Sequence, residues 1–437
     1  MKLVPTPVTG LAVTVRPGRP LAGLVRVDGS KNAALPLLAA AAVIRRPVHL
    51  DNVPDSADVQ QLLTLLQLSD CHLARPVTDP RTVALMPVEG RLPVPELPDA
   101  ARIRASYYLV PALLAACGQA RLPWPGGCRI GERGMDLHFT VYAAFGDKVE
   151  SDKAGYQVTA SGDSPGHVVI DLPFRSRGAS VVAVLRAVAG GHRLLLGNPN
   201  MSPEFTGMLE FLRQAGWRVE LRERTLAVQP PTHADQTRLT WAVPGDKIEA
   251  GTLACAIAAT GGSGRIVGVR GEDTVHVTEA LNWLGIPALA EPDALVLPGG
   301  GAPSGTPLRA VASLAPDGLD ADFEPALMAL TLGLPGTHLC ADEINPGRHG
   351  NLIPQLRTLG AQIEELSPTQ CRLTGPQRLT GAGVRATDIR TGTALLIAGL
   401  TARGTTTITG LDQLRRGHAD LPAKLRALGA DITEVTR

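Results

Sequence analysis

The sequence predicts an α/β fold of six repeated units, three in each of two lobes, with the helices buried and the sheets outside. Three observations support this prediction. A helix rich in alanine and leucine returns six times, a second helix follows each one, and the ends of the second helices recur about every seventy residues. Repeats of this size are too large and irregular for a solenoid, so they indicate duplication of an α/β unit.

The first helix of each unit has small or apolar residues nearly all round, which is typical of a helix that is buried on every side. We expect these helices at Asn32–Val43, Ser106–Cys117, Ala179–Ala189, Gly251–Thr260, Glu324–Leu332 and Thr391–Leu400. Because alanine-rich helices pack closely, we expect them inside the fold and the sheets around them.

The second helix of each unit ends just before an alternating stretch that is typical of a strand. These helix ends lie at 65–73, 142–150, 211–220, 281–289, 355–365 and 424–434. All but the first contain a glycine, which predicts a left-handed residue at the helix C-terminus. Strands are expected at 218–226 and 405–411.

Two links are expected to join the two lobes. A polar, proline-bearing stretch near Leu239–Pro244 separates the third unit from the fourth, and a second link lies at Arg26–Lys31. We expect one lobe of residues 1–30 and 243–437, and another of residues 31–242 that carries the Cys128 loop. Two lobes joined by two strands form a hinged clam shell, whose cleft is the natural ligand site.

The composition excludes several classes of protein. The 437 residues carry a net charge of only +1 and 3% aromatic residues, which argues against nucleic-acid binding. The N-terminus lacks the apolar core of a signal peptide, and no apolar run approaches the roughly 20 residues that span a bilayer. The six cysteines are scattered without a CxxC pair, which argues against zinc or disulfides and fits a reducing cytoplasm.

The stretch Leu122–Leu137 places one thiol, Cys128, in a loop with two prolines and four glycines. Arg129 and Arg133 flank the thiol. Guanidinium charge favours the thiolate and makes the sulfur a better acid or nucleophile. The alternative is an inert cysteine packed under a turn, and the residues alone leave both interpretations open.

Charged residues recur where the buried helices begin. They are Lys31 with Asn32, Arg104, Lys247 with Glu249, Asp322, Arg390 and Arg416. A solvated lysine, or an aspartate that only caps its helix, is the plainer interpretation of each residue alone. Together, several cations with one acid and one thiol suit an anionic substrate that undergoes proton transfer.

These motifs resemble the UDP-N-acetylglucosamine 1-carboxyvinyltransferase family of enolpyruvyl transferases, whose fold is shared by a shikimate-pathway relative. The resemblance runs from about Leu11 to Leu428 and rests on Gly29–Ala34, Ile103–Tyr107, Leu122–Cys128, Asp136–His138, Ala386–Arg390 and Leu425–Ala430. It implies an inside-out α/β prism of two lobes with three repeats each. It also implies transfer of the enolpyruvyl group of phosphoenolpyruvate to the 3′-hydroxyl of UDP-N-acetylglucosamine with release of phosphate. This is the first committed step of peptidoglycan synthesis, in the cytoplasm and without metal or cofactor.

The resemblance also implies residue roles. Cys128 would protonate the vinyl carbon or assist product release, and Asp322 would take the proton from the sugar hydroxyl. Phosphoenolpyruvate would be held by Lys31, Asn32, Arg133, Arg390 and Arg416. The nucleotide sugar would meet Arg104, Arg133, Gly134, Met135, Asp136, Leu137, Ser176, Arg177, Gly178, Asp322 and Ile344. No partner beyond these two substrates is implied; the sequence does not give the oligomeric state, and a monomer is favoured.

The chain departs from the family pattern at several places. The family's Phe-Pro-Thr-Asp is Leu319–Asp322, so the choice of Asp322 over Asp320 depends on its spacing to the next helix. Further departures are Arg177 beside the expected diphosphate site, Met201 in place of an arginine, and Asn345–His349 in place of Glu-Asn-Arg-Phe. Two alternatives follow: a paralogue that binds the UDP-sugar without turnover, or an enolpyruvyl transferase for another acceptor alcohol.

Overall fold

The chain forms two compact units, each with its own hydrophobic core. The computed structural model describes residues 11–44, 46–69, 72–74, 79–86, 92–127, 130–131, 134–162, 165–233, 237–315 and 318–436. The N-terminal unit comprises Asp28–Gly127 and Arg133–Asp246, and the C-terminal unit comprises Met1–Val27, Cys128–Glu132 and Lys247–Arg437. The two clusters of buried apolar side chains follow the same division.

The N-terminal unit contains three mutually contacting helices at its centre, α1 (Lys31–Val43), α3 (Val110–Cys117) and α5 (Arg177–Gly190). Its other helices are α2 (Ala57–Leu68), α4 (Asp136–Ala144), α6 (Pro203–Gln214) and the 3₁₀ helices η1 (Pro98–Arg102) and η2 (Arg104–Leu109). Its strands are β3 (Val48–Asp51), β4 (His72–Ala74), β5 (Val83–Met86), β6 (Gln119–Pro123), β7 (Lys148–Ser151), β8 (Gly155–Thr159), β9 (His167–Asp171), β10 (Arg193–Gly197), β11 (Arg218–Leu221), β12 (Thr225–Gln229) and β13 (Leu239–Ala242).

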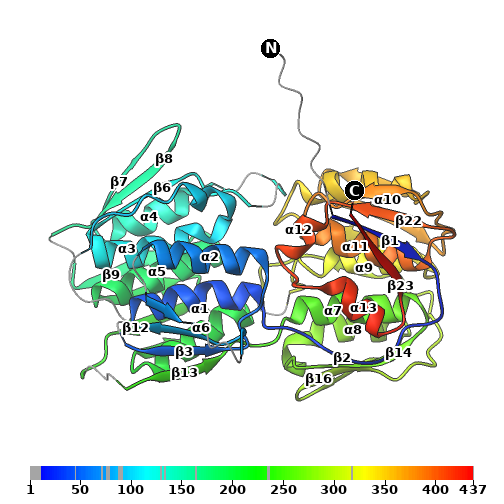
Figure 1. Ribbon diagram of the computed structural model, residues 1–437, viewed down its shortest axis with the longest axis horizontal. Helices are drawn as coiled ribbons and strands as arrows, with labels where there is room; N and C mark the ends of the chain where they lie inside the picture. Colours follow the sequence, from blue (N-terminus) through cyan, green and yellow to red (C-terminus); the bar gives the residue numbers. More distant parts are fainter. Residues whose placement is uncertain are drawn as a thin grey trace, which may run out of the picture. The chain divides into compact units, whose positions relative to one another are not determined.

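The C-terminal unit repeats this plan around α7 (Lys247–Ala259), α9 (Glu324–Thr331) and α11 (Ile389–Thr401), which also contact one another (Figure 1). Its other helices are η3 (Gly271–Thr274), α8 (Val275–Trp283), α10 (Arg348–Thr358), α12 (Leu411–Arg415) and α13 (Leu421–Ala427). Its strands are β1 (Leu11–Arg16), β2 (Ala22–Arg26), β14 (Ser263–Val267), β15 (Leu289–Glu291), β16 (Ala294–Leu297), β17 (Arg309–Val311), β18 (Gly336–Ala341), β19 (Ile363–Ser367), β20 (Gln370–Gly375), β21 (Gly383–Arg385), β22 (Thr406–Thr409) and β23 (Asp431–Thr436).

In the described part of the chain the strands form six sheets, three in each unit. Five of them share one order, a parallel pair at one edge followed by two antiparallel pairs: β13-β3-β5-β4, β9-β10-β12-β11, β2-β14-β16-β15, β17-β18-β20-β19 and β21-β22-β1-β23. The sixth sheet, β6-β8-β7, has three antiparallel strands. A common strand order is what duplication of one unit produces, so the repeats predicted from the sequence are confirmed.

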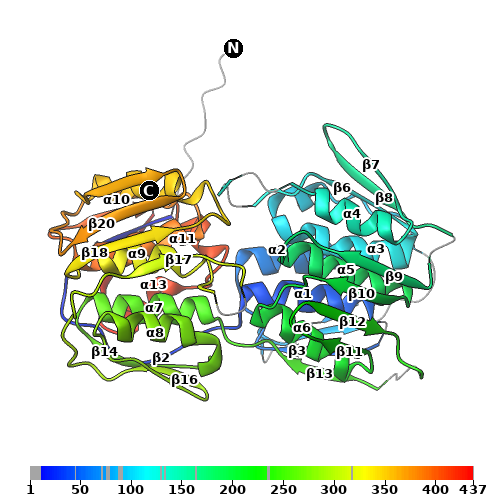
Figure 2. The ribbon, with the colours of Figure 1, turned by 180° about the vertical axis from the view of Figure 1, so that it is seen from behind.

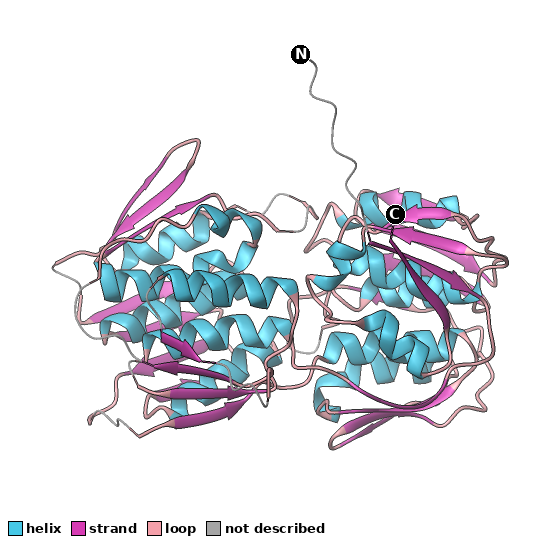
Figure 3. Ribbon diagram, viewed as in Figure 1, coloured by secondary structure: helices cyan, strands magenta, loops and turns pink. Residues whose placement is uncertain are grey.

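The helices lie inside each unit and the sheets lie outside, as the sequence predicts. Figure 3 shows the helices of each unit gathered together with strands along the margins, and Figure 2 shows the β17–β20 sheet beside α9. Twelve of the thirteen residues of α7 are buried, and so are twelve of the thirteen of α11. A helix buried all round carries no amphipathic stripe, which explains why both are apolar nearly all round after their charged first turns.

The second helices end as predicted. Gly146, Gly216, Gly285, Gly360 and Gly429 follow α4, α6, α8, α10 and α13, and each has a positive φ between 81° and 103°. Glycine carries no Cβ and adopts this left-handed conformation without strain, which is why it ends the helix there.

Three boundaries differ from the expectation. The expected helix Ser106–Cys117 is split into η2 and α3, with Pro111 near the start of α3; proline fits the first turn of a helix better than its interior. Leu239–Ala242, expected within a link, is strand β13, paired with β3. Ile130 and Gly131, expected in the lobe of residues 31–242, group with the C-terminal unit, where Gly347 N donates to Ile130 O over 3.0 Å.

Candidate functional site

In the C-terminal unit, Asp322 lies between two arginines. Its Oδ1 is 2.9 Å from Nη2 of Arg348, and its Oδ2 is 2.8 Å from Nη2 of Arg390. The Asp322 side chain is 19% exposed, whereas the two arginines are almost fully buried. Both carboxylate oxygens therefore accept charge-assisted hydrogen bonds, which hold the carboxylate in one orientation while solvent can still reach it.

Three helix N-termini bring these side chains together. Asp322 comes two residues before α9, Arg348 is the first residue of α10, and Arg390 is the second residue of α11. Asp388 caps α11 by accepting hydrogen bonds from the backbone N–H groups of Arg390 and Thr391. The cap fixes the first turn of the helix, and with it the point from which the Arg390 side chain extends.

Arg348 also holds the segment behind Asp322. Its Nη1 donates to the carbonyl of Ala321 and lies 3.1 Å from Oδ2 of Asp342. Burial lowers the pKa of the Arg348 guanidinium, but the carboxylates of Asp322 and Asp342 outweigh it, so the pKa is raised above its ordinary value. The sequence left open whether Arg348 corresponds to the arginine of the family's Glu-Asn-Arg-Phe, because the residues around it depart from that pattern.

Asp320, the other candidate for the acid, occupies a different environment. Its Oδ2 is 3.0 Å from Nζ of Lys247, and its Oδ1 accepts the backbone N–H of Asp322. Asp320 thus stabilises the turn that presents Asp322. Glu324, in the first turn of α9, pairs with the buried His349 over 2.9 Å.

Arg416 and Ile344 lie in loops of the C-terminal unit. Arg416 follows α12, and its Nη1 is 3.4 Å from Oε1 of Gln413. Ile344 lies between β18 and α10, and its backbone N–H donates to Asp342 over 3.0 Å.

In the N-terminal unit, Lys31 is the first residue of α1, directly after the capping Ser30. Its Nζ is 3.1 Å from Oδ2 of Asp58, and the two side chains are 14% and 9% exposed. Asn32 is half-buried beside it. A cation at a helix N-terminus is electrostatically unfavourable, so Asp58, which the sequence did not single out, supplies the counter-charge.

Arg104 and Gly178 approach a shared aromatic pair. The Arg104 guanidinium is 5.9 Å from the centroid of the Tyr107 ring, which meets His138 edge-on at 4.4 Å. A Cβ at Gly178 would lie 2.6 Å from Nε2 of His138 and 2.7 Å from the Tyr107 hydroxyl. Only glycine fits this position. Burial is the larger cause and the charge of Arg104 the smaller one, and together they lower the pKa of His138 to about 3. The imidazole is therefore neutral.

The first turn of α5 carries the expected diphosphate-binding residues. Ser176 caps the helix by accepting the backbone N–H of Ala179. Arg177 extends from the first helical residue, and its Nη2 lies 3.9 Å from the buried carboxylate of Glu204. The added charge at Arg177 therefore has a counter-charge in the protein.

Of the stretch 134–137, Gly134 accepts a hydrogen bond from Arg104 over 3.3 Å, and Met135 is buried just before α4. Asp136 is exposed and Leu137 is half-buried, both in the first turn of α4. Cys128 and Arg133 lie outside the described residues.

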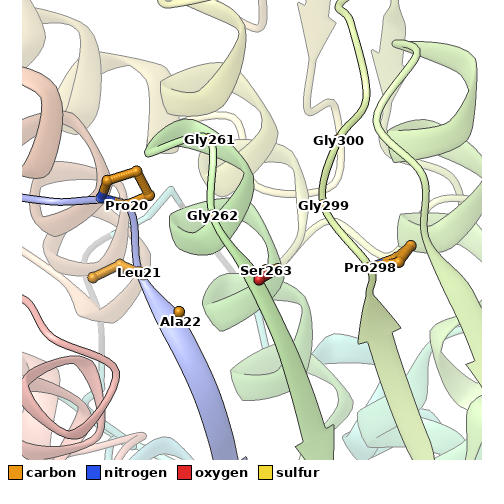
Figure 4. A pocket seen from close by; sticks show the side chains of 9 residues that line it. All are labelled: Pro20, Leu21, Ala22, Gly261, Gly262, Ser263, Pro298, Gly299 and Gly300. Carbon is orange, nitrogen blue, oxygen red and sulfur yellow. The ribbon is translucent and has the colours of Figure 1, made fainter.

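A small surface pocket of about 210 Å³ lies in the C-terminal unit between β2, β14 and the chain after β16 (Figure 4). Pro20, Leu21, Ala22, Gly261, Gly262, Ser263, Pro298, Gly299 and Gly300 line it. It contains none of the predicted site residues. Among the described side chains, no group of three His, Cys, Asp or Glu residues is placed to hold a metal ion.

No helix in the described part of the chain has both the length and the apolar character needed to cross a bilayer. 

Known proteins resemble this chain over nearly its whole length. Residues 15–425 match the family described as EPSP synthase (3-phosphoshikimate 1-carboxyvinyltransferase). A UDP-N-acetylglucosamine 1-carboxyvinyltransferase of Novosphingobium aromaticivorans is 34% identical, with 97% of this chain and 99% of that protein covered. UDP-N-acetylglucosamine 1-carboxyvinyltransferase 3 of Symbiobacterium thermophilum is 33% identical, with 96% of each covered.

Solved structures show the same fold. The enolpyruvyl transferase NikO from Streptomyces tendae superposes with a TM-score of 0.83 at 25% identity, covering 98% of this chain and all of that one. EPSP synthase from Acinetobacter baumannii superposes with a TM-score of 0.75 at 15% identity, covering 97% of this chain and all of that one. The chain thus belongs to the EPSP synthase family of carboxyvinyltransferases.

Proposed function

We propose that this protein transfers the enolpyruvyl group of phosphoenolpyruvate to the 3′-hydroxyl of UDP-N-acetylglucosamine and releases phosphate. Relatives at 33–34% identity over nearly the whole chain bear the name of this activity. The observation that carries the proposal is the carboxylate of Asp322, fixed between Arg348 and Arg390 and 19% exposed. The carboxylate is fixed in orientation and reachable from solvent, so it can accept a proton from a hydroxyl group bound beside it.

The reaction makes four demands on the protein. The vinyl CH₂ carbon must gain a proton, and the 3′-hydroxyl must lose one as its oxygen attacks the resulting cationic carbon. Phosphate must then leave with the electron pair of its C–O bond, and the new methyl group must lose a proton so that the C=CH₂ bond forms again. A carboxylate offers about four lone-pair sites, so Asp322 can accept the hydroxyl proton while both arginines remain bound. Fixed cations stabilise the phosphate as its charge develops.

The roles of the remaining residues are part of the proposal. Cys128 protonates the vinyl carbon or assists product release. Phosphoenolpyruvate binds Lys31, Asn32, Arg133, Arg390 and Arg416. The nucleotide sugar binds Arg104, the stretch 133–137, Ser176, Arg177, Gly178, Asp322 and Ile344. Ser176 caps α5 and Arg177 and Gly178 lie in its first turn; backbone N–H groups at a helix N-terminus favour an anion, which supports the assignment of this segment to the diphosphate. We place the reaction in the cytoplasm, at the start of peptidoglycan synthesis.

The test is phosphate release from phosphoenolpyruvate in the presence of UDP-N-acetylglucosamine, UDP-glucose or shikimate 3-phosphate. We expect release with UDP-N-acetylglucosamine alone, and a loss of about 10²–10⁴-fold in kcat for Asp322→Asn, the range for a missing general base. Folded protein that binds the nucleotide sugar by calorimetry but releases no phosphate would refute the proposal in favour of a sensor. Phosphate release only with UDP-glucose or shikimate 3-phosphate would identify that compound as the acceptor in place of UDP-N-acetylglucosamine.

A further inference from the structure

The buried His418 contacts Arg390 at a guanidinium nitrogen other than Nη2, which binds Asp322. It lies in the loop between α12 and α13, and its side chain is 1% exposed. Its Nε2 is 3.0 Å from Nη1 of Arg390, the arginine whose Nη2 binds Asp322 over 2.8 Å. Each terminal nitrogen of this guanidinium therefore has its own partner.

The contact determines the tautomer of the imidazole. Arginine only donates hydrogen bonds, so Nε2 of His418 must accept and carries no proton. In the neutral ring the proton then sits on Nδ1, which lies 3.9 Å from Oε1 of Glu249. The ring thus directs its lone pair toward Arg390 and its N–H side toward a carboxylate.

Glu249 is itself held in place. It lies in the first turn of α7, its side chain is 1% exposed, and its Oε2 is 2.6 Å from Nζ of Lys424 in α13. Lys424 thus provides the charge that stabilises a buried carboxylate. A continuous series of contacts runs from Lys424 through Glu249, His418 and Arg390 to Asp322.

We propose that His418 is a positioning residue for the Arg390 guanidinium. The imidazole accepts a hydrogen bond from Nη1 and so fixes the rotation of the guanidinium. In this rotation Nη2 donates to Asp322, and the other N–H groups are oriented toward the anionic co-substrate. The role in catalysis rests on the proposed function, whereas the geometry of the contact does not. A guanidinium that one hydrogen bond already holds in place loses less conformational freedom when it binds an anion.

The experiment compares His418→Leu with His418→Gln, because glutamine keeps an acceptor for Arg390 and a donor for Glu249. His338→Leu is the matched control. His338 is a fully buried histidine of the same unit whose Nδ1 accepts the backbone N–H of Leu308, so its role is structural.

For His418→Leu we expect KM and Kd for phosphoenolpyruvate to rise about 10- to 100-fold, the loss that one hydrogen bond to a charged group produces. For His418→Gln we expect a change of less than about threefold, since its acceptor replaces the lost one. Affinity for UDP-N-acetylglucosamine should change less than affinity for phosphoenolpyruvate in both variants, because Asp322 keeps its hydrogen bond from Arg348. His338→Leu should lower Tm without raising KM.

Three results would overturn the proposal. One is a leucine variant no more affected in KM than the His338 control, and another is a glutamine variant as impaired as leucine. The third is a ¹⁵N NMR spectrum of histidine-labelled protein, assigned by the signal lost in His418→Gln, that shows a proton on Nε2. This spectrum needs no substrate. A wild type that fails to bind or convert phosphoenolpyruvate would refute the proposed function, while the spectrum still tests the contact with Arg390.

Discussion

Arg348 offers the sharpest test of how the C-terminal unit holds Asp322. The side chain is 2% exposed and donates to Ala321 and Asp322, with Asp342 at 3.1 Å. Arg348→Met keeps the length of the apolar stem and removes every charged contact, which leaves Asp342 buried beside an uncharged neighbour. Breaking a buried pair from one side costs about 3–5 kcal/mol in the free energy of unfolding.

This cost translates into a measurable shift. In domains of about 150–250 residues, 1 kcal/mol moves Tm by about 2–4 °C, so the Arg348→Met transition should fall by about 6–20 °C in scanning calorimetry. We also expect a fall in kcat for phosphate release, because Asp322 loses one of the two arginines that orient it.

The matched control is Arg372→Met on the outer sheet of the same unit. Arg372 makes three hydrogen bonds to Glu364, but the side chains are 49% and 57% exposed. An exposed pair contributes about 0.2–1 kcal/mol, so Tm should move by less than about 4 °C. Equal shifts in the two variants would refute the reasoning, because burial would then not decide the cost.

Three further predictions follow from single contacts. Gly178→Ala should weaken UDP-N-acetylglucosamine binding in calorimetry, because its methyl group would lie 2.6 Å from the ring of His138. Gly207→Ala is the control, since its methyl group enters open space, and should leave affinity unchanged. Equal affinities of the two variants would contradict the prediction. Burial lowers the pKa of His349, but its hydrogen bond and charge contact with Glu324 outweigh it and raise the pKa, so its stabilising effect should be complete below about pH 6.5 and decline as pH rises through the folded value. Urea titrations of wild type and His349→Gln should therefore differ most on the acid side, and a gap that widens with pH would be evidence against the pair. Cys128 should be the thiol alkylated fastest by a small epoxide phosphonate, as four of the other cysteines are buried; mass spectrometry showing equal labelling in Cys128→Ala would disprove it.

Much of the fold can be predicted from the sequence because it depends on residues that are close together in the chain. The glycines at 146, 216, 285, 360 and 429 end helices because a left-handed residue is needed there, and that need depends only on the last turn of the helix. The apolar helices predict their own burial for a similar reason. Helix α7 begins at Lys247, four residues before the expected start at Gly251, because Lys247 and Glu249 pair with Asp320 and Lys424 and so can be buried within the helix.

In the candidate site, too, some features could be predicted from the sequence and others depended on tertiary contacts. The sequence by itself determined the repeats, the glycine-ended helices and the placing of charges at helix starts, since each depends on neighbours along the chain. Only the tertiary structure decided that Asp322 and not Asp320 meets two arginines, and that His418 stands behind Arg390. Those partners are 26 to 68 residues apart in the chain. Their pairing arises from three helix N-termini packing around one core, and hydrogen bonds between such distant residues have no periodic signature in the sequence.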